Sequence, residues 1–292
     1  MKETDLKSLL RGMARNAVRL EIGGEINAEI GRFGGRPDVP PGFVWPFFDT
    51  DTFDDTTVKP RPLSFLAQFD CAALAPLDLD GLLPHEGVLS FFYELYSQRW
   101  GFGPEDTGCS RVFWFPDQTV LCPAEFPEGM EDYLRLPSLP IRGRSETEYP
   151  SYEEFSVALE LWELCRKESQ EPWEVFGEMR KTIGGCEETP PPWHRLLGWP
   201  NIIQGNMTQE CELISRGYSI GSGLKDIPKG IWEEVGEGSL NAWRLLFQLD
   251  SNVHTKDFSL DFGDSGSIYF YIRKEDLAAR RFDRVWLILQ CY

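Results

Sequence analysis

The stretch PLSFLAQFD, residues 62–70, decides the fold, because a closely similar stretch recurs near the end of the chain. It is a short apolar run of the kind that is typical of a buried β-strand. Residues 242–250 read AWRLLFQLD, so the glutamine and the aspartate of the second stretch each lie 180 residues beyond those of the first. The two stretches therefore predict the same strand in two copies.

Two further pairs of blocks flank these strands in the same order. GGRP at 34–37 precedes the first copy, and LGWP at 197–200 precedes the second. EGVLSFFY at 86–93 follows the first copy, and SGSIYFYI at 265–272 follows the second. Three matching blocks in one order predict a tandem duplication. We therefore expect an α+β fold of internally duplicated β-rich units around a pseudo-twofold axis, with peripheral helices and a helical insert.

The domain organisation follows from the positions of these blocks. The 292 residues are expected to form a single domain made of two repeats, residues 1–292. The first unit covers approximately 18–144 and the second unit covers 189–292. The segment between them, 145–188, is acidic and is predicted to be the helical insert.

The predicted insert carries the signals of two helices. Ser151 and Glu154 have the spacing of a capping box, in which side chains bind the free backbone N–H groups of a first turn. An apolar helical face follows at Phe155, Ala158, Leu159, Trp162 and Cys165. Pro172 fits the first turn of the second helix, whose apolar stripe is Phe176, Met179 and Ile183.

The charge of the chain limits its partners. The 47 acidic and 29 basic residues give a net charge of −18. Such a surface repels phosphate backbones and anionic lipid heads, so we expect neither nucleic acid nor a membrane as a partner. A small molecule or a protein, including a basic one, stays compatible with this charge. No apolar run reaches the roughly 18 residues that a spanning helix needs.

The cysteines indicate the compartment. There are seven, an odd number, at widely spaced positions and without a C-x-x-C pair. This usage is typical of reduced thiols. The first helix-like segment carries charges throughout, unlike a secretory signal. A cytoplasmic location is therefore expected.

The glutamine and aspartate that end each repeated strand are the leading candidate site residues. Gln68 and Asp70 are two positions apart, as are Gln248 and Asp250, so each pair lies on one side of its strand. Polar groups at the end of a buried strand must find hydrogen bonds. Two roles stay open: the side chains bind loop backbone, or they line a cleft shared by the two units.

The full set of candidate ligand-binding residues adds one acid, one arginine, two loop tryptophans and one more glutamine. Loop aromatics can serve as ligand platforms, and they can also plug the ends of sheets. The set is Gln68, Asp70, Gln248, Asp250, Asp264, Arg36, Trp45, Trp199 and Gln204. The histidines, His85, His194 and His254, have no partner at metal-ligand spacing. No catalytic residue, metal ligand or cofactor is predicted.

One short motif resembles a catalytic segment. Gly263-Asp264-Ser265-Gly266 resembles the nucleophile segment of trypsin-like serine proteases, which also needs a histidine base and an orienting acid. The matching position of the first copy reads His85-Glu86-Gly87 and has no serine. A turn that enters a strand accounts for both copies.

Four longer stretches resemble one bacterial family. RFGGRPDVPPGFVWP, PLSFLAQFD, HRLLGWPNIIQGNM and KEDLAARRFDRVWLILQCY are similar to the YwqG-like family, a domain of unknown function, and the similarity runs from about Arg32 to Tyr292. The resemblance implies an α+β fold with internal duplication. It implies no catalytic residue and no cofactor.

Two functions from different classes stay open. The favoured one is a non-catalytic module that binds a ligand or a protein, with toxin immunity as a special case, because an acidic surface could mask a basic active site. The alternative is a small-molecule hydrolase that uses carboxylates in a cleft between the repeats. It requires Asp70, Asp250 and Asp264, together with His194, to meet around one pocket.

Overall fold

The fold is built on one ten-stranded sheet in which every neighbouring pair is antiparallel. The computed structural model describes residues 3–23, 29–52, 54–157, 171–183, 190–223, 225 and 227–292. Across the sheet the strands are β16 (Trp286–Gln290), β15 (Ser267–Arg273), β12 (Trp243–Asp250), β11 (Arg195–Leu197), β1 (Arg15–Ile22), β10 (Leu139–Glu148), β2 (Gly31–Phe33), β6 (Ser64–Asp70), β7 (Val88–Tyr93) and β8 (Ser110–Phe115).

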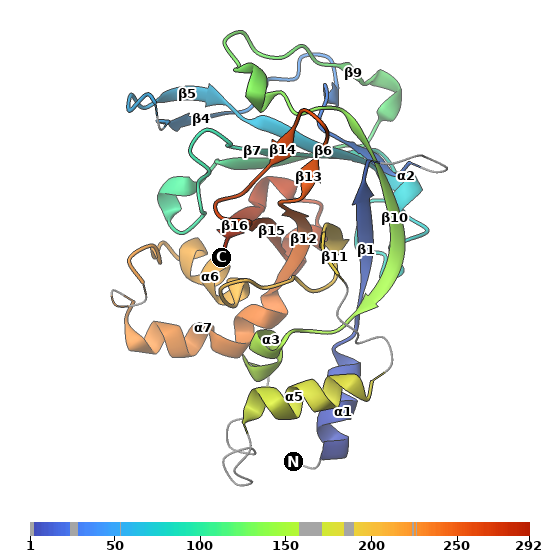
Figure 1. Ribbon diagram of the computed structural model, residues 1–292, viewed down its shortest axis with the longest axis vertical. Helices are drawn as coiled ribbons and strands as arrows, with labels where there is room; N and C mark the ends of the chain where they lie inside the picture. Colours follow the sequence, from blue (N-terminus) through green and yellow to red (C-terminus); the bar gives the residue numbers. More distant parts are fainter. Residues whose placement is uncertain are drawn as a thin grey trace.

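Smaller elements surround this sheet (Figure 1). Three two-stranded pairs are formed by β3 (Asp38–Val39) with β9 (Cys122–Pro123), β4 (Phe47–Thr50) with β5 (Lys59–Pro62), and β13 (Val253–His254) with β14 (Ser259–Leu260). The helices are α1 (Glu3–Gly12), α2 (Cys71–Leu74), α3 (Tyr152–Val157), α5 (Pro172–Lys181), α6 (Met207–Ser215), α7 (Lys229–Ala242) and α8 (Lys274–Ala278). Figure 1 shows α1, α3, α5 and α7 gathered at the end of the molecule opposite the β4–β5 pair. The large sheet with peripheral helices confirms the α+β class.

The two wings of the sheet share one pattern of strand pairing. On β6, Gln68 pairs with Arg32 of β2 on one side and with β7 on the other. On β12, Gln248 pairs with Arg195 of β11 on one side and with β15 on the other. The register also shifts at the same place in each wing, between Phe65 and Ala67 and between Leu245 and Phe247. These matches support the predicted duplication.

The turns after β2 and β11 match as well. Gly34 and Gly35 have φ values of 58° and 71°, and Leu197 and Gly198 have φ values of 60° and 71°. This left-handed region favours glycine because a Cβ atom is strained there. Leu197 adopts this strained conformation although it is not a glycine. Its side chain is only 1% exposed, so it contributes packing that glycine would not supply.

The first strand of each wing is exchanged between the wings. Strand β1 pairs with β11, and β10 pairs with β2, while β1 and β10 pair with each other at the centre. The unit boundary expected at residue 144 therefore falls inside β10, and equivalent halves would begin at β1 and at β10. Strand β10 is difficult to predict because its sequence, LPIRGRSETE, is polar and only partly buried along its length.

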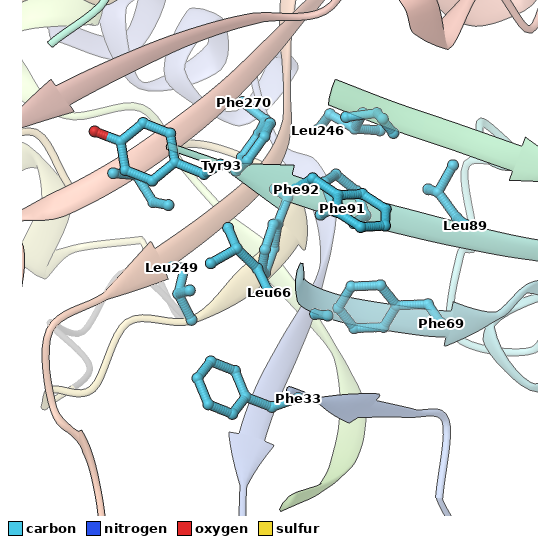
Figure 2. Packing of buried hydrophobic residues seen from close by; sticks show 14 of the residues in the cluster. Phe33, Leu66, Phe69, Leu89, Phe91, Phe92, Tyr93, Leu246, Leu249 and Phe270 are labelled. Atoms are coloured by element: carbon cyan, nitrogen blue, oxygen red, sulfur yellow. The ribbon is translucent and has the colours of Figure 1, made fainter. Parts of the chain in front are cut away.

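The core between the wings is aromatic. Phe69 and Phe91 come from the β6–β7 wing, and Phe247 and Phe270 come from the β12–β15 wing. The centroids of the Phe91 and Phe247 rings are 4.7 Å apart, and those of Phe69 and Phe247 are 5.5 Å apart. Figure 2 shows Phe69 and Phe91 on neighbouring strands with Phe270 reaching toward them. Packing of these rings holds the two wings face to face.

The predicted insert contributes α3 and α5. The backbone N–H of Ser151 donates to Glu154 Oε2 at 2.9 Å, which is the Glu154 half of the expected capping box. Phe176, Met179 and Ile183 are buried against Leu10 of α1, as their spacing predicts. The rest of the first predicted stripe, from Ala158 to Cys165, lies outside the described residues. In the described part of the chain, no helix has the length and apolar character needed to span a membrane.

Candidate ligand-binding site

The two glutamines of the repeated strands bind loop backbone, which is one of the two roles that the sequence left open. Gln68 Nε2 donates to the Asp38 carbonyl at 2.7 Å and to Ser90 Oγ at 2.8 Å, and Gln68 Oε1 accepts from the Asp38 N–H at 3.1 Å. Gln248 Oε1 accepts from the Asn201 N–H at 3.0 Å. Each glutamine thus fixes the loop that follows β2 or β11.

The aspartates Asp70 and Asp264 also serve local structure. Asp70 Oδ1 caps α2 by accepting from the N–H groups of Ala72 at 2.8 Å and Ala73 at 3.1 Å. Asp264 is exposed, and its carbonyl accepts from the N–H of Tyr292 at 3.1 Å. Neither side chain lines either of the cavities described below.

Asp250 and His194 lie together in the core, where they are 2% and 1% exposed. His194 Nδ1 accepts from the backbone N–H of Asp250 at 3.1 Å. Burial, aided by the charge of Arg19, lowers the pKa of His194 to about 3, so the imidazole is neutral. The Asp250 carboxylate accepts from the Trp193 N–H and from Ser267 Oγ, each at 3.2 Å. These side chains are sealed from solvent and hold the backbone around them.

The other predicted residues are spread over the molecule. Arg36 pairs with exposed Glu125. Trp45 is buried, and its Nε1–H donates at 2.8 Å to the carbonyl just before β6. Gln204 is exposed, and its backbone N–H donates to Gln290 Oε1 at 3.1 Å. The predicted set therefore does not form one site.

A cavity of about 600 Å³ lies at a different place, where both halves of the chain meet. Its lining comes from the α1–β1 junction, the loop 80–82, the turn 197–199, the α7–β12 junction and α8. The lining residues are Gly12, Met13, Ala14, Arg15, Asn16, Asp80, Gly81, Leu82, Leu197, Gly198, Trp199, Leu240, Asn241, Arg244, Leu245, Lys274, Leu277, Ala278 and Arg280. We call it the inter-wing cavity.

Trp199 is the predicted site residue that reaches the inter-wing cavity. Its Nε1–H donates to the Met13 carbonyl at 2.9 Å, which fixes the plane of the indole. The Arg15 guanidinium lies over that plane, 3.2 Å from the ring centroid. Such a stack holds a guanidinium in place without neutralising its charge.

Four cationic side chains line the inter-wing cavity, against the single carboxylate of Asp80. They are Arg15, Arg244, Lys274 and Arg280. Among the residues that the structure describes, none of the four forms an ion pair. Many arginines elsewhere are paired with acids, as in the pairs Arg32–Asp38, Arg61–Asp55 and Arg195–Glu148. Unpaired cations are therefore concentrated at this cavity in a strongly acidic protein.

Backbone carbonyls position two of these cations. Arg244 Nη1 donates to the Trp243 carbonyl at 2.9 Å and to the Leu240 carbonyl at 3.3 Å, at the C-terminal end of α7. Arg280 Nη2 donates to the Leu83 carbonyl at 3.0 Å. A carbonyl is neutral, so it orients a guanidinium but leaves its full charge for another partner.

The protonation state of Glu154, near the cavity, leaves this positive charge unneutralised. Burial, together with the charge of Arg244, lowers the pKa of Arg15 to about 9. Burial also raises the pKa of Glu154 to about 8, although Arg15 acts in the opposite direction. Burial therefore favours the neutral form of Glu154, which does not neutralise Arg15. Desolvated like charges in a cavity are stabilised by a bound anion.

A second cavity, of about 160 Å³, lies between the Asp106–Arg111 segment and the Asp283–Leu287 segment. Its lining includes two acids, Asp106 and Asp283, and two bases, Arg111 and Arg284. It is much smaller than the inter-wing cavity, and its charges balance.

The cations of the inter-wing cavity were missed by sequence reasoning because they do not belong to the repeat. Arg244 stands where the first copy has Ser64, 180 residues earlier. That mismatch inside an otherwise matching apolar strand is the one signal in the sequence that could have found it. Lys274 is the first residue of α8 and Arg280 follows that helix, whereas in the described residues the first wing has no α-helix directly after β7.

Comparison with known proteins places the chain in one family. The chain belongs to the family described as domain of unknown function (DUF1963), which matches residues 31–291. No curated protein matches the chain. Within the described ranges, no group of three or more His, Cys, Asp or Glu side chains is arranged to hold a metal ion.

Proposed function

We propose that this member of the DUF1963 family is a non-catalytic binding module whose ligand is a small anionic molecule held in the inter-wing cavity. The observation that carries the proposal is the gathering of Arg15, Arg244, Lys274 and Arg280 around one cavity without an ion pair in the described part of the chain. A protein with a net charge of −18 has many carboxylates with which to neutralise cations. Leaving these four available favours a ligand that brings its own negative charge.

The lining supports binding more than catalysis. Three of the four cations are guanidinium groups, which donate hydrogen bonds and cannot serve as general bases at neutral pH while they stay charged. The one lining carboxylate, Asp80, accepts from the backbone N–H of Asn16 at 3.1 Å. The alternative of a hydrolase loses its main support, because Asp70, Asp250 and Asp264 do not meet at this cavity.

The subfamily, the location in the cell and a protein partner are also part of this proposal. Within the DUF1963 family, the resemblance to the YwqG-like family stays a prediction. A cytoplasmic location is supported by free thiols at Cys71, Cys109, Cys122, Cys211 and Cys291. A basic protein partner, such as a toxin, is supported by the net charge alone.

Thermal unfolding with a panel of small anions tests the proposed function. The panel consists of benzoate, octanoate, citrate, inorganic phosphate and adenosine monophosphate. At least one anion should raise Tm by about 5 °C at a hundredfold excess over its Kd. Arg244→Met and Lys274→Met should each reduce that increase, because each removes a charge from the cavity.

The matched control is Lys256→Met, which removes an exposed lysine outside the cavity. It should leave the increase in Tm unchanged. The proposal is refuted if no anion of the panel binds, or if the cavity variants and the control respond alike.

A further inference from the structure

The charged part of the inter-wing cavity has a defined centre. Arg15 is fixed on the face of Trp199, and Arg244 is fixed on the carbonyls that end α7. The two guanidinium groups are close enough for the charge of Arg244 to lower the pKa of Arg15. Two fixed guanidinium groups with free N–H donors match a single carboxylate or phosphate group.

The rest of the lining is apolar. Met13, Leu82, Leu197, Leu240, Leu245 and Leu277 supply aliphatic side chains, and together they come from both halves of the chain. More of the cavity surface is apolar than polar. An inorganic anion would satisfy the guanidinium groups and leave this surface in contact with water. An apolar group attached to the anion would cover it, which is favourable.

The size of the cavity agrees with such a ligand. Its volume of about 600 Å³ lies within the range of sites that bury most of an organic small molecule. Lys274 is exposed and Arg280 is half-buried, so further positive charge extends from α8 toward solvent. This positive charge would attract an anion to a protein whose overall charge repels it.

The following inference rests on the proposed function. The geometry points to an amphipathic organic acid as the ligand. One carboxylate or phosphate group would lie between Arg15 and Arg244, and an aliphatic or aromatic body would pack against the leucine side chains. The size of the apolar part of the ligand, and not its charge alone, then determines the affinity. Each added methylene should tighten binding by about three- to fourfold until the cavity is filled.

Calorimetric titration with a matched series tests this inference. The probes are butanoate, hexanoate and octanoate, with octyl phosphate to compare the two head groups. Octanol and octylammonium keep the apolar chain without the negative charge, and inorganic phosphate keeps the charge without the chain. Kd should fall roughly a hundredfold from butanoate to octanoate, which differ by four methylenes. Octanol, octylammonium and inorganic phosphate should bind at least tenfold more weakly than the better of the two eight-carbon anions.

Two leucines of one loop give a matched pair of variants. Leu82 is half-buried and lines the cavity, whereas Leu79 is 71% exposed and does not. Leu82→Asn should reduce the gain in affinity from butanoate to octanoate, and Leu79→Asn should preserve it. Tm of each variant without ligand shows whether both remain folded.

The outcomes separate this inference from the proposed function. If butanoate, octanoate and inorganic phosphate bind with equal affinity through Arg244, the apolar part of the inference is wrong and an anion-binding function stands. If octanol binds as tightly as octanoate, the head group between the arginines is wrong. If no anion of the series binds, the proposed function fails together with the inference.

Discussion

Phe91 of β7 and Phe270 of β15 occupy equivalent positions in the two wings, and their rings meet edge to face with centroids 5.2 Å apart. Both side chains are fully buried. The contact lies where the two wings pack on each other, so it joins the halves of the chain rather than neighbouring strands.

A double-mutant cycle at this contact tests how strongly the wings are coupled. Phe91→Leu and Phe270→Leu should each lower the free energy of unfolding by about 1–3 kcal/mol, because each shrinks a fully buried ring. The two changes should couple by about 0.5–1.5 kcal/mol, measured by urea unfolding. As a control, Phe113→Leu on β8, whose ring packs on Phe43, should combine additively with Phe270→Leu. Additivity of the Phe91 and Phe270 changes would show that the rings do not couple the wings.

The two strand glutamines should differ in their contribution to stability. Gln68 uses both amide atoms, whereas Gln248 Nε2 is buried without a hydrogen-bond partner in the described structure. Gln68→Met should therefore lower the free energy of unfolding by about 1–3 kcal/mol, and Gln248→Met by less than about 1 kcal/mol. Chemical denaturation of the two variants measures both values. The opposite order would contradict the hydrogen bonds described here.

Glu154 should make stability depend on pH. It is 1% exposed, and burial raises its pKa from the ordinary value of 4.5 to about 8. Because the folded-state pKa is the higher one, the unfolded chain loses this proton first. The contribution to stability is complete below about pH 4.5 and is lost as the pH rises through about 8. Glu154→Gln removes this loss, so at pH 8 its Tm should exceed that of the natural protein by about 2–4 °C.

Differential scanning calorimetry between pH 5 and pH 9 checks this prediction. Glu128→Gln, at an exposed loop position, is the matched control and should keep the pH dependence of the natural protein. If Tm of Glu154→Gln falls with pH as steeply as that of the control, Glu154 does not titrate in this range.

The same carboxyl should make anion binding depend on pH. Above about pH 8 Glu154 ionises, and its negative charge offsets the positive charge of Arg15 in the inter-wing cavity. Affinity for octanoate should therefore fall about three- to tenfold from pH 7 to pH 9. In Glu154→Gln the affinity should fall less between pH 7 and pH 9, because the glutamine carries no charge. An equal fall in the variant and in the natural protein would contradict this role of Glu154.

Much of the fold could be predicted from the sequence. Strands β6 and β12, and β7 and β15, are long apolar runs, and burial on both faces is what makes such runs visible. Strand β10 was missed because Leu139–Glu148 is partly exposed along its length and therefore reads as polar. The exchange of β1 and β10 was also missed, since the pairing partner of a strand is not encoded in its own apolar pattern.

The candidate site was much less predictable. Gln68 and Gln248 stood out because a polar residue in an apolar strand is conspicuous, yet that polarity serves the loops after β2 and β11. Arg15 and Arg244 are far apart in the chain and come together because β1 pairs with β11, which pairs with β12. Trp199 was found because it is a loop tryptophan, and Arg36 stands at the same place in the first copy.

The exchange of β1 and β10 has a consequence for synthesis of the protein on the ribosome. When the N-terminal half emerges, β2 lacks β10 and β1 lacks β11, so both strands expose unpaired backbone groups until later residues follow. Such edges invite pairing with other nascent chains. Completion of the sheet must await the arrival of partners more than a hundred residues downstream, and pairing over such separations is slow. Cellular yield should therefore depend on protection of the unfinished sheet by chaperones.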